Sequence, residues 1–236
     1  MLKIVNFTKK YGDKVAVDNL SLELFEGEIC GFIGHNGAGK TTTLKAAIGL
    51  LDFDEGVITI DGISIKENPL ECKKLTAYIP DNPELYDYLT GIKYLNFIAD
   101  VYKIGEERDA LIKEYSDRLG LTESLASPIG SYSHGMKQKL AIISAWIHSP
   151  RFIMMDEPFV GLDPKASFIL KEMMHEHCAK GGTIFFSTHV LDVAEKLCDR
   201  IAIIKDGKLV TIGDTEAVKG SDSLEDVFLD LEDRAE

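Results

Sequence analysis

The segment Gly34–Thr41 has the spacing G-x-x-x-x-G-K-[ST], in which every fixed residue type suits a phosphate group. Glycines let successive backbone N–H groups turn toward an anion, and the N-terminus of a following helix adds partial positive charge. In such a loop the lysine, here Lys40, reaches the β- and γ-phosphates, and the hydroxyl of Thr41 ligates Mg²⁺. The pattern therefore predicts a site for a nucleoside triphosphate with Mg²⁺. The predicted nucleotide contacts here are His35, Asn36, Gly37, Ala38, Gly39, Lys40, Thr41 and Thr42.

A second group of candidate residues follows the apolar run Phe152–Met155, which predicts a buried strand. An acid at the end of such a strand holds Mg²⁺ in enzymes with this phosphate loop, and we expect that role for Asp156. Glu157 is the candidate for orienting and polarising the attacking water. Side chains alternate along a strand, so these two neighbours are expected to point in different directions, which suits two separate tasks. Taken alone, the run also fits an ordinary strand with an acidic turn.

The elements that must hold these residues can be predicted from the apolar pattern around them. The run Ile29–Ile33 predicts a strand entering the phosphate loop, and residues 41–50 predict a helix leaving it. In the first third of the chain, alternating residues predict strands, and Asp61-Gly62 predicts a hairpin between two of them. Later apolar runs alternate with helical segments, which favours a parallel sheet covered on both faces. These runs are 75–79, 152–155, 183–186 and 201–204.

Between about residues 82 and 150 the apolar spacing becomes helical, as at Leu95 and Ile98. We therefore predict an α/β fold for residues 1–220, with a helical insert at about 82–150. Residues 221–236 are acidic and predict a short C-terminal helix.

Composition restricts the class of protein. The chain has 236 residues, 45% of them hydrophobic and 28% charged, which is typical of a globular protein. A net charge of −13 argues against nucleic acid as a partner, because phosphate contacts need a basic face. No apolar run approaches the roughly 18 residues that cross a bilayer. The apolar stretch at the start of the sequence is too short for a secretory signal. We expect a cytosolic chain whose four cysteines are free thiols. They are Cys30, Cys72, Cys178 and Cys198.

The segment Tyr132–Met136 opens a predicted helix upstream of the strand that ends in Asp156. Ser-x-Gly in this position resembles the signature loop of ABC-type ATPases, whose consensus is L-S-G-G-Q and which other P-loop enzymes lack. The loop makes a second helix N-terminus suited to phosphate, with Ser133 as hydroxyl donor and Gly135 as backbone donor. The resemblance implies nucleotide contacts from Ser133, Gly135 and Met136. It also implies a P-loop NTPase of ABC type, with a parallel-sheet core, an N-terminal antiparallel β subdomain and the helical insert.

The other motifs of the family follow in order along the chain. Tyr11 lies where the family has an aromatic residue that stacks on adenine. Val160–Asp163, called the crossing loop below, resembles the loop that crosses the dimer interface in this family. His189 matches the switch histidine that contacts the γ-phosphate. The resemblance thus implies an ATPase with a catalytic set of Glu157, His189 and Lys40.

The chain departs from the family pattern at three positions that matter. Asp81 stands where the family has a glutamine beside the metal; its carboxylate is expected to reach Mg²⁺ directly or through water, or else to be a structural turn acid. His134 and Met136 replace a glycine and a glutamine of the signature loop. Since Ser133 and Gly135 remain, we expect the phosphate contact to persist and the glutamine contact to be lost. We expect His134 to face solvent; the alternative is that it adds charge near the nucleotide at low pH.

A cluster of His175, His177 and Cys178 has the composition of a metal site but not its geometry. On a helix His175 and Cys178 share a face, whereas His177 points roughly 200° away from His175. We therefore predict no metal site at this cluster. The predicted ligands of Mg²⁺ are Thr41, Asp156 and Asp81.

The resemblance also implies partners. We expect a head-to-tail dimer, of identical or different ATPase subunits, with each ATP between the phosphate loop of one chain and residues 133–136 of the other. We also expect the energy-supplying subunit of an ABC transporter, cytoplasmic and held at the inner face of the cell membrane by an integral membrane permease. The expected docking surface in the helical insert includes Tyr86, Asp87 and Tyr88.

The direction of transport is indicated only by variant segments. Residues 78–81, 133–136 and 223–228 resemble the branch of the family that pairs with export-type permeases. Two other classes stay open. A cytosolic mechanical ATPase of DNA repair or the ribosome shares these motifs, but usually carries long coiled coils or tandem ATPase domains. A small-molecule kinase with a phosphate loop lacks the signature loop. The transported substrate is expected to depend mainly on the permease.

Overall fold

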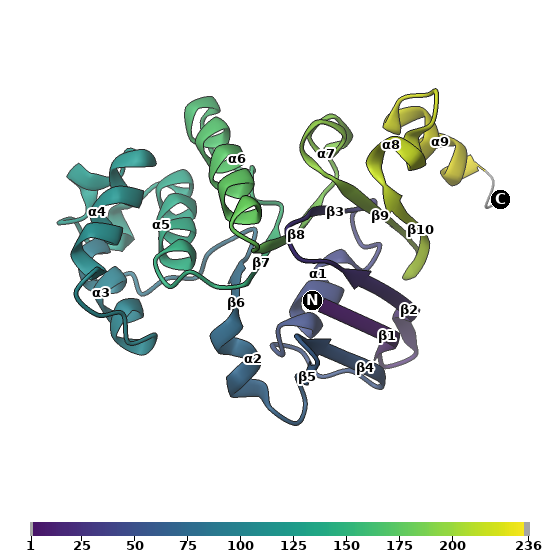
Figure 1. Cartoon of the computed structure of the whole chain (residues 1–236), viewed down its shortest axis with the longest axis horizontal. Coiled ribbons are helices and arrows are strands. Elements are labelled where there is room, and N and C mark those ends of the chain that lie inside the picture. The colour runs from purple at the N-terminus through teal and green to yellow at the C-terminus, as the bar shows by residue number, and fades with distance from the viewer. Residues whose placement is uncertain (1, 234–236) are drawn as a thin grey trace.

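The computed structural model describes residues 2–233, whose strands form two sheets with helices around them (Figure 1). The first sheet is built from β1 (Leu2–Tyr11), β2 (Lys14–Leu24), β4 (Glu55–Ile60) and β5 (Ile63–Ser64). These strands are antiparallel, in the order β2-β1-β4-β5. Asp61 and Gly62 join β4 to β5 with φ angles of 51° and 78°, the conformation that two-residue hairpin turns favour. The predicted N-terminal antiparallel subdomain is confirmed.

The second sheet forms the centre of the molecule. Its strands are β3 (Ile29–Ile33), β6 (Thr76–Ile79), β7 (Phe152–Asp156), β8 (Thr183–Thr188), β9 (Arg200–Lys205) and β10 (Lys208–Asp214). The order is β10-β9-β3-β8-β7-β6, and every neighbouring pair is parallel except β10 with β9. Every residue of β3, β7 and β8 is buried, because helices or the first sheet cover both faces. The predicted parallel core is confirmed.

Helices pack on both faces of the central sheet. They are α1 (Lys40–Ala47), α2 (Pro69–Leu75), α3 (Gly91–Val101), α4 (Arg108–Arg118), α5 (His134–Trp146), α6 (Pro164–Ala179), α7 (Leu191–Leu197), α8 (Thr215–Lys219) and α9 (Leu224–Asp233), with short 3-10 turns η1 (Thr122–Ser124) and η2 (Ile129–Ser131). Because side chains alternate along β7, Met154 packs in the cluster that contains Leu44 of α1 and the first sheet. Ile153 packs in the other cluster, with Leu170 of α6. Helix α1 is therefore held between the two sheets.

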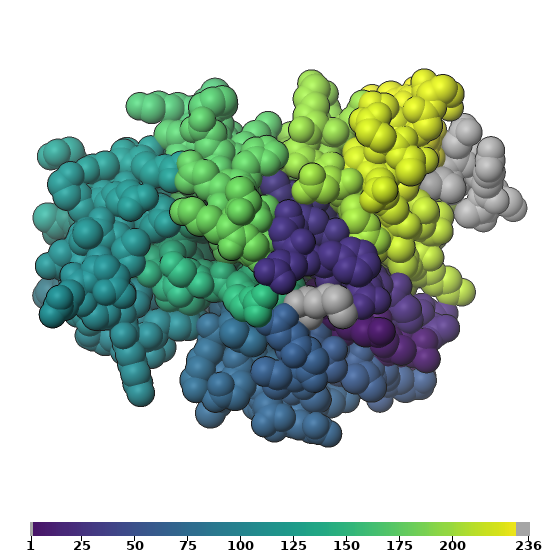
Figure 2. Space-filling model, in the orientation of Figure 1, coloured from purple at the N-terminus to yellow at the C-terminus, as the bar shows by residue number. Residues whose placement is uncertain are grey.

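The helical segments at residues 82–150 gather at one end of the molecule, and the C-terminal helices at the other. Figure 2 shows the first group as a teal lobe and the second in yellow. Leu224 of α9 is buried, and its N–H donates to Glu195 Oε2 at 3.1 Å. Residues 234–236 of the predicted C-terminal helix lie outside the described residues. Across residues 2–233, no helix has the length and apolar character needed to span a bilayer.

Caps decide where the helices of the site begin. Asp163 Oδ1 accepts the N–H of Ala166 at 2.8 Å and so starts α6. Ser133 Oγ accepts the N–H of Met136 at 3.3 Å at the start of α5. Helix α1 differs, because its N-cap is Gly39 and no side chain accepts its first N–H groups. Those donors therefore remain available to a ligand.

Candidate nucleotide site

The phosphate loop connects β3 to α1 at the carboxyl edge of the central sheet, and two of its glycines are required by close packing. A Cβ atom on Gly34 would lie 2.4 Å from the carbonyl oxygen of Ile204. Gly39 has a φ of 109°, and a Cβ there would lie 2.8 Å from the carbonyl oxygen of Ala16. The loop thus wraps tightly between neighbouring strands and presents the uncapped start of α1.

Lys40 is the charged group of this loop, and its side chain is only 6% exposed. The ammonium group donates to the carbonyl oxygens of Gly34 at 2.6 Å and His35 at 3.2 Å. It also lies 3.9 Å from Glu157 Oε1. Burial lowers the pKa of Lys40, although the carboxylates of Glu157 and Asp156 act in the opposite direction. The ammonium group is therefore only partly compensated by the protein, which favours an anionic ligand.

Asp156 ends β7 and is 2% exposed. The hydroxyl of Thr41 donates to its Oδ2 at 2.6 Å. The hydroxyl of Ser187 donates to its Oδ1, because Asp156 and Ser187 are paired in the β7–β8 register. Sequence reasoning did not single out Ser187. Its only signal was a small polar residue at the end of an apolar strand, just before Thr188-His189.

Glu157 lies in the left-handed region, with a φ of 46°. Its N–H donates to two oxygens of Ser187, the hydroxyl at 3.0 Å and the carbonyl oxygen at 3.2 Å. We expected strand alternation to separate Glu157 from Asp156, but β7 has already ended at Asp156. The separation comes instead from this left-handed turn, a conformation that costs a non-glycine residue about 1 kcal/mol or more and is concentrated at functional sites.

His189 directly follows β8 and lies next to Glu157, which also faces Lys40. Its Nδ1 lies 2.9 Å from Glu157 Oε1, the same oxygen that faces Lys40. The three residues proposed from sequence as a catalytic set therefore meet at one carboxylate oxygen. The His189 ring remains half exposed, so a ligand can reach it.

An open cavity of about 330 Å³ runs along this cluster. Its lining contains most of the predicted nucleotide contacts, together with Lys14 and Ala16, which sequence reasoning did not single out. Tyr11 stands at the cavity as a half-exposed ring with the ammonium group of Lys9 5.1 Å from its centre. The predicted residues that line the cavity are Tyr11, Asn36, Gly37, Gly39, Lys40, Thr41, Thr42, Asp81, Asp156 and Glu157.

The signature loop is not part of this cavity. Ser133, Gly135 and Met136 are absent from its lining, and the Ser133 hydroxyl is engaged in capping α5. Within one chain, the structure therefore does not bring these three predicted contacts together with the phosphate loop.

The residues present fit a Mg²⁺ ion. Thr41 and Asp156 are already in hydrogen-bond contact, and Asp81 lines the same cavity. The hydroxyl of Tyr78 is buried without a protein partner; its pKa is raised by burial first, and then by the nearby carboxylates of Asp156 and Asp81. Hydroxyl and carboxylate oxygens are the hard donors that Mg²⁺ prefers, and it usually takes one or two carboxylates plus substrate phosphates.

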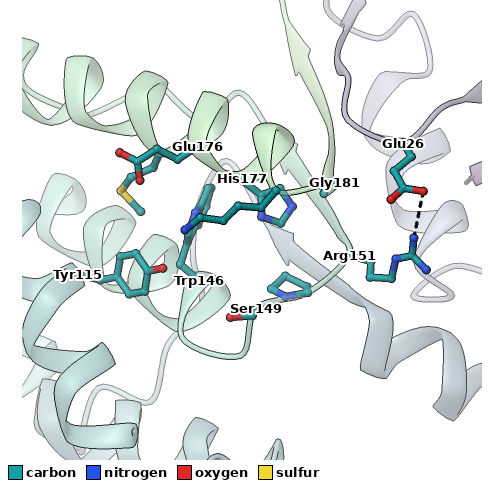
Figure 3. A pocket seen from close by; sticks show the side chains of 12 residues that line it. Glu26, Tyr115, Trp146, Ser149, Arg151, Glu176, His177 and Gly181 are labelled. Carbon is teal, nitrogen blue, oxygen red and sulfur yellow. Dashed lines mark ion pairs between the residues drawn. The ribbon is translucent and has the colours of Figure 1, made fainter.

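A second hollow, of about 260 Å³, lies at the opposite edge of the sheet (Figure 3). Its carboxylates are already paired, Glu26 with Arg151 at 3.4 Å and Glu176 with Arg118 through two bonds. Burial lowers the pKa of His177, which favours its neutral form. Within residues 2–233, no group of three His, Cys, Asp or Glu side chains that could hold a metal ion is found.

Comparison with known proteins identifies the family. A family model described as "ABC transporter" matches residues 17–160, more than half of the chain. The chain belongs to this family of ATP-binding subunits. A solved structure titled "Structure of ATP binding subunit of ABC transporter" superimposes with a TM-score of 0.94 at 33% identity, covering 98% of this chain and 99% of that one. The ABC-type P-loop fold expected from the motifs is confirmed.

Two further relatives bear on function. The linearmycin resistance ATP-binding protein LnrL of Bacillus subtilis is 36% identical over 217 residues, which is 90% of this chain and 69% of LnrL. The ATP-binding cassette MJ0796, solved as a post-hydrolysis dimer bound to ADP and Pi, superimposes with a TM-score of 0.81 at 26% identity, covering 91% of this chain and 99% of that one. The present ABC ATPase binds and hydrolyses ATP.

Proposed function

We propose that this ABC ATPase powers export through a membrane permease, and that ATP binding closes two ATPase subunits head to tail. One observation carries the proposal. Lys40 and His189 both face Oε1 of Glu157. The signature residues 133–136, in contrast, do not line the cavity. A site completed by a second chain would bring both sets to one nucleotide. The half-exposed valines Val160 and Val190, near Glu157 and His189, support an apolar contact there.

In this proposal each group has a defined task. Lys40 and the free N–H groups of α1 neutralise charge that develops on the transferred phosphoryl group. Glu157 orients the attacking water and accepts its proton, while His189 holds the Glu157 carboxylate and contacts the γ-phosphate. Tyr11 stacks on the adenine. Most of the rate enhancement then comes from positioning and charge stabilisation.

We also propose that Thr41 and Asp156 hold Mg²⁺, with Asp81 as a direct or water-mediated third group. The ion, when bound, neutralises phosphate charge. Asp156→Asn is expected to raise the divalent-ion concentration for half-saturation about 10-fold or more, and Asp81→Asn by a smaller factor, because Asp81 is exposed to solvent. Mn²⁺ titration followed by EPR, with ADP present, measures this directly. Asp109→Asn on α4 is the matched control, and an unchanged affinity in Asp156→Asn would contradict the assignment.

The helical insert offers the surface for a permease. Tyr86 lies among three aromatic rings, with ring centres 5.9 Å from Tyr88, 6.3 Å from Tyr94 and 6.0 Å from Phe97. Tyr88 is 80% exposed, and with the half-exposed rings of Tyr86 and Phe97 it forms a contiguous aromatic patch of the kind that marks interaction sites. Asp87 is fixed beside these rings by Lys137, 2.7 Å away. We propose that this aromatic surface docks the permease and so places the chain at the inner face of the membrane.

Tyr88→Ala is expected to weaken permease binding on the order of 30-fold, because exposed aromatic anchors dominate such interfaces. ATP turnover by the isolated subunit should not change. Co-purification from mild detergent extracts measures the first quantity and phosphate release the second. Leu70→Ala, which removes another exposed apolar side chain, is the control. Equal recovery of the permease with both variants would contradict the docking surface.

The first experiment is a pull-down of the tagged chain from native cells in mild detergent. A co-purifying protein with several membrane-spanning helices is expected. Recovery of only ribosomes, DNA or soluble proteins would instead support a mechanical ATPase not linked to transport. Export is supported by the 36% identity to a resistance ATP-binding protein. It predicts that a deletion strain becomes sensitive to at least one compound in a toxic-compound panel, whereas a growth defect on a limiting nutrient would favour import.

We further propose that residues 1–220 act as one ATPase domain with an insert at about 82–150, and that 221–236 is an added acidic segment. Helices α3, α4 and α5 in the insert, and α9 after Gly220, support this division.

A further inference from the structure

His134 is exposed to solvent, as expected, but one side of its ring is covered by the crossing loop. A Cβ atom built on Gly161 would lie 2.3 Å from Cδ2 and 2.9 Å from Nε2 of His134. The imidazole therefore lies directly against the Cα atom of Gly161. The φ of Gly161 is +80°, a conformation that glycine adopts readily, and the missing side chain lets the ring contact the Cα atom.

Two more contacts join the same segments. A Cβ atom on Gly135 would lie 2.4 Å from the carbonyl oxygen of Gly161, so the backbones of the signature loop and the crossing loop touch. Lys139, one turn into α5, is 2.7 Å from Asp163 Oδ2, while Asp163 Oδ1 caps α6. The first turn of α5 and the crossing loop are thus held together through a ring, a backbone contact and an ion pair.

The crossing loop is also continuous with the proposed catalytic glutamate. The N–H of Val160 donates to the carbonyl oxygen of Glu157 at 3.1 Å, and that of Leu162 to Phe159 at 3.3 Å. Residues 157–163 therefore form a compact turn that starts at Glu157 and ends against His134. The signature loop and Glu157 are thus joined by a continuous set of packed and hydrogen-bonded residues.

We infer that His134 is a positioning residue that couples the two nucleotide sites of the dimer. The inference rests on the proposed function, in which Ser133 of a chain serves one ATP and Glu157 of the same chain serves the other. Engagement of Ser133 by nucleotide then fixes Glu157 for its own site. The ring matters because a glycine, the residue usual at this position in the family, has no side chain to cover Gly161.

The test measures closure rather than turnover. In the Glu157→Gln background, the ATP concentration for half-maximal dimerisation is determined by analytical ultracentrifugation. His134→Ala, which keeps the Cβ but removes the ring, is expected to raise that concentration about 5-fold or more, a typical coupling between sites. Binding of a fluorescent ATP analogue to the monomer should not change. With Glu157 intact, the Hill coefficient of ATP turnover should fall toward 1 in His134→Ala.

Matched variants separate coupling from loss of folding. Lys137→Ala, on the same helical turn but ion-paired with Asp87, is expected to leave the ATP concentration for half-maximal dimerisation unchanged. His134→Phe keeps a ring over Gly161 and should restore the parental midpoint. Gly161→Ala should impair dimerisation more in the parent, which has His134, than in the His134→Ala variant. The backbone strain at a φ of +80° is the same in both proteins, whereas the clash of the new Cβ with the imidazole occurs only in the parent.

The failures of the two proposals can be distinguished. If Glu157→Gln dimerises with ATP and His134→Ala shifts neither the midpoint nor the Hill coefficient, the coupling role is wrong while the proposed dimer stands. If Glu157→Gln does not dimerise with ATP at all, the proposed closure is overturned, and this inference with it.

Discussion

Replacement of Glu157 by Gln is expected to reduce ATP turnover about 100-fold or more while leaving ATP binding intact. The amide keeps the size of the side chain and its contact with His189, but it cannot take a proton from water, a contribution of typically 10²–10⁴-fold. ATP then binds and closes the dimer without being consumed. Phosphate release measures turnover, and size-exclusion chromatography with ATP measures the trapped dimer.

Glu26→Gln is the matched control for this experiment. It makes the same chemical change beside Arg151 (Figure 3), at a residue that does not line the cavity of the phosphate loop. Turnover near the wild-type value in Glu157→Gln would remove the glutamate from the mechanism. Loss of ATP binding in the same variant would indicate a damaged site rather than a missing base.

Replacement of Lys40 by Met is expected to abolish most ATP affinity without lowering stability in the absence of nucleotide. Loss of a buried charge that pairs with a ligand costs roughly 2–5 kcal/mol, or about 30-fold or more in the dissociation constant. Isothermal titration with ATP checks the affinity, and calorimetric melting without nucleotide checks the stability.

The stability expectation follows from the sign of the pKa shift. Burial lowers the pKa of Lys40 in the folded chain, so the unfolded chain holds this proton more tightly. The charged lysine therefore opposes folding at neutral pH, and the cost is relieved only as the pH rises through the folded pKa toward the unfolded one. Lys45→Met, on the exposed side of α1, is the control. A large drop in melting temperature for Lys40→Met alone would contradict this account.

Much of the site could be predicted from sequence because its parts are local. The phosphate loop, the Asp156-Glu157 pair and His189 are each defined by a few consecutive residues next to a strand. The parallel order of strands then brings their carboxyl ends to one edge, so Glu157 and His189 meet although they are separated along the chain.

The remainder depends on contacts that no short motif encodes. Ser187 was missed because its partnership with Asp156 arises from the β7–β8 register. The left-handed turn at Glu157 was missed because non-glycine residues rarely adopt that conformation. The ring of His134 was expected to face solvent, and its contact with Gly161 became visible only once α5 and the crossing loop were placed side by side.

The chain contains one tryptophan, Trp146, which ends α5 and lies beside His177 of α6, with ring centres 6.2 Å apart. The indole is almost fully buried and borders the hollow at the edge of the sheet away from the nucleotide. Tryptophan emission is therefore expected to be insensitive to contacts made at Tyr11, which lines the other cavity. It is expected to respond when α5 moves against α6, so the native protein carries an optical reporter of the contact between these two helices that needs no label.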